Sequence, residues 1–259
     1  MLDVHGIPAF DDNYIWCLSR HGCRSAAVVD PGDEEPVLAY LGDKDLRLDA
    51  ILITHRHGDH TGGVRALKSV FPAATVFGPA GESIPTLEQR LSGGDRVDLT
   101  DLGAGFEVMD VPGHTEGHIA YYGEGMLFCG DTLFAAGCGR VFSGTHEQLH
   151  RSLQRIAHLP GDTLLFCAHE YTRDNLGFAL WVEPGNERLQ QRVREVAELR
   201  EQHQPTVPSL LNEELETNPF LRTAQPEVIA AAQAYAGRPL PTGEEVFTAI
   251  RTWKDREYD

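Results

Sequence analysis

The sequence predicts an α/β (α+β) protein in which a strand-rich front is followed by a helical tail. Short apolar and β-branched runs, punctuated by Gly, Pro and Asp, recur up to about residue 167, and segments of helical period lie between some of them. After about Tyr171 these runs stop and only helical periods remain. With 259 residues, of which 41 % are hydrophobic, the chain can form one large domain, or one domain and a smaller one.

Each element of the front is predicted from its own pattern. The predicted strands are residues 14–18, 26–29, 50–54, 75–77, 106–111, 126–129 and 164–167. Apolar residues spaced three and four apart predict helices at residues 64–71 and 149–156. Because helices do not separate every pair of strands, the pattern differs from a regular βαβ alternation.

The tail is predicted to contain helices and no strands. Helical periods cover residues 189–199, 227–235 and 246–253, and a proline-spaced stretch joins the first of them to the second. The last helix begins with Thr242 and Glu245, three residues apart, which is the capping-box pattern that satisfies two free backbone amides. We therefore divide the chain into residues 1–172 and residues 173–259.

The charge balance excludes some classes of partner. The chain has 22 Lys and Arg against 39 Asp and Glu, a formal net charge of −17. A nucleic-acid binder needs a basic surface that displaces the counterions of the phosphates, so we expect no nucleic-acid partner. Any anionic ligand must be bound by a few well-placed Arg or Lys side chains.

Neither a signal peptide nor a membrane helix is predicted. No apolar run approaches the ~18 residues of a membrane span, and the first Lys or Arg of the chain is Arg20. Five cysteines, an odd number without C-x-x-C spacing, indicate reduced thiols that fill the core. We therefore expect a cytosolic protein without a membrane partner. We also expect a monomer.

The segment from Thr54 to His60 predicts a metal site. It follows an apolar strand and contains His55, His57, Asp59 and His60 within one turn. Imidazole and carboxylate ligands suit Zn²⁺ and similar ions, and a loop at the end of a strand allows such side chains to converge. The alternative is a surface loop that merely contains several histidines.

Three further candidate ligands also follow apolar strands: His114, Asp131 and His169. One such residue alone is more often an ordinary turn residue, but three in succession favour a site. Tetrahedral zinc takes four ligands, so this many candidates indicates two metal ions that share a carboxylate. Asp131 is the natural bridge.

The order of these residues, beginning with Asp30, resembles the metallo-β-lactamase superfamily over residues 1 to about 172. A closer resemblance, to the glyoxalase II family of hydroxyacylglutathione hydrolases, covers the whole chain. It rests on residues 7–16, 29–32, 112–118, 130–134, 137–140, 167–171 and 218–222. The segment Gly137-Cys-Gly-Arg140 and the helical tail are what specify glutathione thioesters within the superfamily.

The resemblance implies a four-layer αββα sandwich with a C-terminal helical substrate-binding domain. It also implies two divalent metal ions, Zn or else Fe or Mn. His55, His57 and His114 would hold one ion, Asp59, His60 and His169 the other, and Asp131 both. Asp30 would brace the ligand loop without binding a metal. Arg140, Tyr171, Arg251 and Lys254 would bind the substrate.

The implied activity is hydrolysis of S-D-lactoylglutathione to D-lactate and glutathione by a metal-bridged hydroxide, the second step of methylglyoxal detoxification. Asp131, Asp59, His55 and His57 would carry the catalysis. Two alternatives stay open, a persulfide dioxygenase with a single iron and a metal-binding protein without catalysis. Some members of the family carry Lys at the Arg140 position and Tyr at the Phe142 position. These two differences bear on the affinity for the substrate and not on the type of reaction.

Overall fold

The computed structural model describes residues 2–258. Clustering of contacts divides the chain into two compact units. Unit 1 comprises residues 1–110 and 117–130, and unit 2 comprises residues 111–116 and 131–259. The division predicted at residue 172 follows changes in sequence pattern instead of spatial contacts, and it stays a prediction.

Unit 1 contains two sheets and three α-helices within the part of the chain that the structure describes. Its elements are β1 (Leu2–Ala9), β2 (Asn13–Arg20), β3 (Ser25–Val29), α1 (Glu34–Asp43), β4 (Arg47–Leu52), α2 (Gly58–Thr61), α3 (Val64–Val70), β5 (Thr75–Pro79), β6 (Gln89–Leu91), β7 (Arg96–Leu99), the 3₁₀ turn η1 (Thr100–Leu102), β8 (Ala104–Asp110), β9 (Ile119–Gly123) and β10 (Met126–Gly130). The first sheet has the strand order β1-β2-β3-β4-β5-β6, antiparallel from β1 to β3 and parallel from β3 to β6. The strands β7, β8, β9 and β10 pair in that order, all antiparallel.

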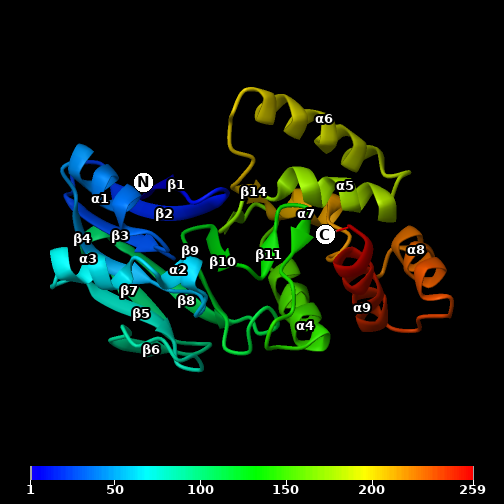
Figure 1. Ribbon diagram of the computed structural model, residues 1–259, viewed down its shortest axis with the longest axis horizontal. Helices are drawn as coiled ribbons and strands as arrows, with labels where there is room; N and C mark the ends of the chain where they lie inside the picture. The colour runs from blue at the N-terminus through cyan, green and yellow to red at the C-terminus, as the bar shows by residue number, and fades with distance from the viewer. Residues whose placement is uncertain (1, 259) are drawn as a thin grey trace. The chain divides into compact units, whose positions relative to one another are not determined.

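A hydrophobic core joins the first sheet of unit 1 to its helices. Leu41 of α1 and Leu67 of α3 pack against Val28 and Ile51 of the sheet, and all four are fully or almost fully buried. Figure 1 shows α1 and α3 lying along this sheet. All five residues of β3 are buried, as expected for a strand in a parallel pairing with both faces covered.

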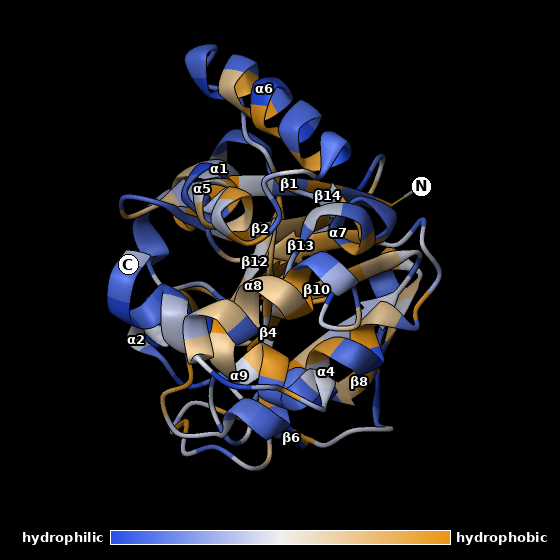
Figure 2. Ribbon diagram, turned by 90° about the vertical axis from the view of Figure 1, so that its right-hand side faces the viewer, coloured by the Kyte–Doolittle hydropathy of each residue, from blue (hydrophilic) through white to orange (hydrophobic). Residues whose placement is uncertain are grey.

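Unit 2 is mainly helical. Its elements are β11 (Leu133–Phe134), β12 (Gly137–Cys138), α4 (His146–Ala157), β13 (Leu164–Cys167), α5 (Thr172–Val182), α6 (Glu187–Glu201), β14 (Ser209–Leu210), α7 (Leu211–Thr217), α8 (Pro226–Ala236), α9 (Gly243–Trp253) and the π-helical turn η2 (Lys254–Tyr258). Helix α6 is amphipathic, and its buried residues Leu189, Arg192 and Val196 lie on one face. Figure 2 shows apolar and polar residues alternating along this helix.

The structure contains every strand and helix predicted above, with shifted ends. The strand predicted at residues 50–54 ends at Leu52, so His55 follows it by a short turn. The hydroxyl of Thr242 accepts a hydrogen bond from the backbone amide of Glu245, which confirms that Thr242 caps the last helix. The prediction that strands end before the tail was wrong in one detail: β14 pairs with β13, because Leu164 and Leu165 have a free strand edge that residues 209–210 occupy.

Among residues 2–258, no helix is both long enough and apolar enough to cross a membrane.

Candidate metal centre

The histidine-rich segment of unit 1 lies between β4 and α2. The strand ends at Leu52, and the short helix α2 begins directly after His57 and contains Asp59 and His60. His55 Nε2 lies 3.0 Å from His57 Nδ1. Asp59 Oδ2 lies 3.3 Å from His60 Nε2. The segment therefore presents two pairs of facing ligand atoms.

Asp30 supports this segment from the end of β3. Its carboxylate accepts a hydrogen bond from the backbone amide of Thr54 at 2.7 Å, and its Oδ2 lies 3.1 Å from His60 Nδ1. The backbone of Asp30 has φ = 52°, in the left-handed region that few residues other than glycine adopt. Asp30, His55 and His60 also form a cluster with the spacing of metal ligands, so the bracing role predicted for Asp30 stays a prediction.

Unit 2 carries the other three candidate ligands. His114 Nε2 lies 3.5 Å from Oδ2 of Asp131, and His169 Nε2 lies 3.4 Å from Oδ1 of the same carboxylate. The opposite nitrogen of His114, Nδ1, faces the backbone oxygen of Arg140 at 2.8 Å. A carbonyl can only accept, so this Nδ1 carries the proton and Nε2 presents its lone pair toward Asp131.

These distances fit metal coordination within each unit. Two ligands about 2.0–2.1 Å from one zinc ion, at a tetrahedral angle, lie roughly 3.3 Å apart. The four pairs of facing atoms are 3.0, 3.3, 3.4 and 3.5 Å apart. Imidazole nitrogen and carboxylate oxygen are ligands that zinc, iron and manganese all accept.

Unit 2 also contains the four residues predicted to bind substrate. Tyr171 stacks on the ring of His169, with ring centroids 4.7 Å apart. The guanidinium of Arg251 is buried and donates hydrogen bonds to the backbone oxygen of Cys138 at 3.0 Å and to Asp255 at 2.8 Å.

The other two differ in exposure. Half of the Arg140 side chain is exposed, and its Nε lies 3.7 Å from Asp255, the carboxylate that also binds Arg251. Lys254 is buried and donates a hydrogen bond to Oδ1 of Asn175 at 2.8 Å. Their substrate-binding role stays a prediction.

Sequence reasoning missed two residues that contact candidate ligands. Asn13, the first residue of β2, donates a hydrogen bond to Asp59 Oδ2 at 3.2 Å. His118 stacks on His55 with ring centroids 4.6 Å apart. The only sequence signal was that both lie within segments that carry the family resemblance.

The buried cysteines supply no ready nucleophile. Burial raises the pKa of the Cys17 and Cys167 thiols to about 12 and that of Cys138 to about 11. All five cysteines are free thiols, as predicted. Since the thiolate is the reactive form, the three thiols with raised pKa are inert near neutral pH.

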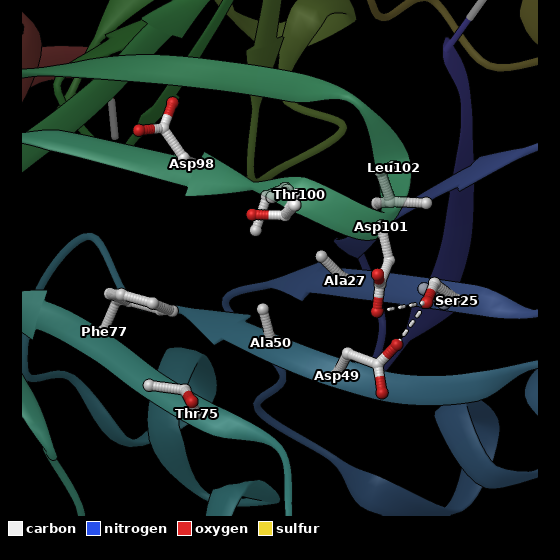
Figure 3. Close-up of a pocket in the computed structure, with 12 residues that line it drawn as sticks. Ser25, Ala27, Asp49, Ala50, Thr75, Phe77, Asp98, Thr100, Asp101 and Leu102 are labelled. Atoms are coloured by element: carbon white, nitrogen blue, oxygen red, sulfur yellow. Dashed lines mark hydrogen bonds between the residues drawn. The ribbon is translucent and has the colours of Figure 1, made fainter.

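A cavity of about 180 Å³ lies elsewhere in unit 1, between the first sheet and the segment from β7 to η1 (Figure 3). Ala27, Ala50 and Phe77 line it with apolar surface, and the hydroxyl of Ser25 donates to Asp49 and Asp101 at its edge. No histidine or cysteine lines this cavity among the described residues. Within residues 2–258, the groups with the spacing of metal ligands consist of Asp30 and the candidate ligands described above.

Comparison with protein families matches nearly the whole chain. Residues 15–169 match the metallo-β-lactamase superfamily, and residues 170–257 match the hydroxyacylglutathione hydrolase C-terminus.

Individual relatives agree with these matches. A hydroxyacylglutathione hydrolase from Aeromonas hydrophila subsp. hydrophila is 54 % identical over 98 % of this chain and 99 % of its own length. One from Pseudomonas paraeruginosa is 52 % identical over 99 % of this chain and 100 % of its own length.

Among solved structures, ETHE1 from Myxococcus xanthus has a TM-score of 0.69 at 22 % identity, covering 100 % of this chain and 93 % of that one. A likeness at this identity shows the fold alone. Together with the superfamily match it confirms the predicted α/β sandwich with a helical C-terminal region.

Proposed function

Since the chain belongs to the hydroxyacylglutathione hydrolases of the metallo-β-lactamase superfamily, we propose that it hydrolyses S-D-lactoylglutathione to D-lactate and glutathione. The support is the identity of 52–54 % to relatives of that name over their full length. The enzyme is thus a thioester hydrolase, and it would act second in methylglyoxal detoxification. The alternative hypothesis, a persulfide dioxygenase with one iron, is less supported, because residues 170–257 match the C-terminus of the hydroxyacylglutathione hydrolases.

We propose that seven residues hold two divalent ions, with zinc as the first choice and iron or manganese as the alternatives. His55, His57 and His114 would bind one ion, Asp59, His60 and His169 the other, and Asp131 both. The observation that carries this assignment is the orientation of Asp131, whose two oxygens each face a different imidazole. Structural zinc sites are closed by four protein ligands, so a carboxylate shared by two ions favours a catalytic site over a metal-binding protein without catalysis.

With two divalent ions bound, these residues would hold a site that supplies hydroxide near neutral pH and polarises the thioester carbonyl. The chain's own residues prepare the site. The backbone oxygen of Arg140 fixes the tautomer of His114, and Asn13 holds the carboxylate of Asp59. The leaving thiol has a pKa of about 8.5 and departs as a thiolate, so no strong general acid is needed.

The substrate is anionic and the protein carries a net charge of −17, so binding requires local cations. We propose that Arg140, Arg251 and Lys254 supply them and that Tyr171, beside His169, contacts the glutathione part of the substrate. The same net charge supports the absence of a nucleic-acid partner. We further propose that the protein acts as a cytosolic monomer without a membrane partner.

An assay with matched thioesters tests the proposed substrate. We expect kcat/KM for S-D-lactoylglutathione to exceed that for an uncharged D-lactoyl thioester at least tenfold, and no oxygen to be consumed with glutathione persulfide. Equal turnover of both thioesters would refute glutathione recognition. Oxygen consumption with the persulfide would establish the dioxygenase alternative instead.

A further inference from the structure

Thr54 lies between two residues of the proposed metal site. Its hydroxyl is 2.7 Å from Asp30 Oδ2 and 3.1 Å from His55 Nδ1. Thr54 and His55 are fully buried, and Asp30 is 4 % exposed. The backbone of Thr54 is also held, because its amide donates to Asp30 and its carbonyl accepts from Ile119 at the start of β9.

The direction of these hydrogen bonds follows from the donors available. A carboxylate only accepts, so the single proton of the Thr54 hydroxyl points to Asp30. The hydroxyl oxygen must then accept from His55, which places the proton of that imidazole on Nδ1. The Nε2 of His55 is left with its lone pair toward His57, as a metal ligand requires.

Asp30 contacts His60 directly, and not through Thr54. Its Oδ2 faces His60 Nδ1 at 3.1 Å, so that nitrogen carries the proton and His60 Nε2 presents its lone pair toward Asp59. His55 and His60 belong to different ions in the proposed assignment. One buried carboxylate therefore sets one tautomer in each of the two ligand sets.

The surrounding backbone leaves space for this arrangement. A Cβ at Gly130 would lie 2.3 Å from the Thr54 hydroxyl and 2.9 Å from the ring of His118, which stacks on His55. Gly130 also has φ = 48°, which disfavours any other residue. The ring of His55 is thus fixed at Nδ1 by a hydroxyl and on one face by a second imidazole.

We propose that Thr54 is a positioning residue that extends the hydrogen bonding of Asp30 to His55 and thereby tunes only the ion bound by His55 and His57. This inference rests on the proposed metal assignment. Removing the hydroxyl should weaken one site, while the direct contact of Asp30 with His60 preserves the other. Loss of such an orienting hydrogen bond typically costs 10–100-fold in metal affinity.

The test titrates metal-free protein with Zn²⁺ against a chromogenic chelator, to obtain two dissociation constants. For Thr54→Val we expect one constant to rise about 10–100-fold and the other to stay within about threefold of wild type. Thr54→Ser keeps the hydroxyl and should match the wild type at both sites. A Thr54→Val protein that binds both ions normally, or that loses both equally, would overturn the inference.

A measurement on the unmodified protein guards against a variant that does not fold. The ¹⁵N chemical shifts of the metal-free wild type should show His55 protonated at Nδ1, and finding the Nε2–H tautomer there would also overturn the inference. Binding of fewer than two Zn²⁺ ions by the wild type would instead refute the metal assignment itself. The two failures are therefore distinguishable.

Discussion

Asp131 is the residue that we propose to bind both metal ions. Each of its oxygens faces an imidazole nitrogen at a distance that suits ligands of one metal ion. Asp59 differs, because its Oδ2 faces one imidazole, that of His60, and receives a hydrogen bond from Asn13. The two carboxylates should therefore respond differently to removal.

Asp131→Ala should abolish hydrolysis and lower the metal content, because two cations would face each other without the shared negative charge. Asp59→Ala should empty mainly one site, since its carboxylate is assigned to a single ion. Metal analysis of both purified variants, together with their turnover of S-D-lactoylglutathione, checks this. A variant at Asp131 that keeps two ions and near-normal turnover would refute the bridging role.

Arg251 and Lys254 are both buried and already have hydrogen-bond partners within the protein, so their proposed contact with glutathione needs a direct test. If they bind a glutathione carboxylate away from the reacting bond, the contact is equal in ground and transition states. The double Arg251→Ala, Lys254→Ala variant should then raise KM and leave kcat nearly unchanged. Each lost contact should cost about 1.5–3 kcal/mol, roughly tenfold to a hundredfold in kcat/KM.

A control variant and an unfolding measurement are needed to interpret the kinetics of the double variant. Arg256→Ala removes an exposed cation from the turn η2 and should change neither constant. Thermal unfolding of each variant shows whether the helix packing has failed. A double variant that is folded and keeps the full preference for glutathione thioesters over an uncharged thioester would show that this pair is not the glutathione site.

At the scale of elements, α6 and α7 are joined by a buried ion pair. Arg192 donates to Glu214 at 2.5 Å and to the hydroxyl of Thr217 at 2.6 Å, and both charged side chains are almost inaccessible. The other oxygen of Glu214 accepts from the backbone amide of Ala136 at 2.7 Å. The pair therefore also fixes the short segment that connects β11 to β12.

Arg192→Met should destabilise the protein by about 3–5 kcal/mol, because it leaves the carboxylate of Glu214 buried without its partner. Arg188→Met, on the same helix, is the matched control. Arg188 is one-third exposed and pairs with Glu195 at 2.9 Å and with Glu213, so solvent screens these pairs and its loss should cost less than the loss of the buried Arg192. Denaturant unfolding measures the free energy of unfolding of both variants. Equal decreases would contradict the stabilising role of the buried Arg192–Glu214 pair.

The stability of the protein should depend on pH through a histidine at the contact between α4 and α9. His150 lies against Phe247, with ring centroids 5.5 Å apart, and burial lowers the pKa of its imidazole. The unfolded chain, with a pKa of about 6.5, therefore binds more protons than the folded chain below that pH. Stability should fall as the pH drops below about 6.5 and level off once the lower folded pKa has been passed.

His150→Gln should remove part of this dependence. The quantity to measure is the difference in unfolding free energy between variant and wild type from pH 7.5 to pH 5. His158→Gln, an exposed histidine at the end of the same helix, serves as the control. A pH dependence that is the same in all three proteins would contradict the role of His150.

At the scale of the whole molecule, the sequence predicted those elements whose burial produces a strong pattern. Strands such as β3 and β10 are continuous apolar runs, so they are visible in the sequence. Strand β1 was missed because none of its first five residues is buried and Asp3, His5 and Gly6 interrupt any apolar run. Helix α5 was missed because its buried face includes Thr172 and Asn175, which blur the apolar period.

The candidate site was predictable for a different reason. Its residues follow apolar strands, and that placement can be recognised without a structure. The supporting contacts could not be predicted, because Asn13 and His118 reach the candidate ligands from separate segments, and the hydroxyl of Thr54 contacts His55 only in this backbone geometry. Such contacts depend on register and backbone geometry, including the left-handed conformations of Asp30 and Gly130.

In the proposed site, two metal ions held jointly through Asp131 are required for thioester hydrolysis. Titration of metal-free protein with Zn²⁺, while turnover of S-D-lactoylglutathione and bound metal are both measured, tests it most directly. We predict that activity reaches its plateau at two ions per chain and that Asp131→Ala shows no such plateau. Full activity at one ion per chain, or none at two, would contradict the account.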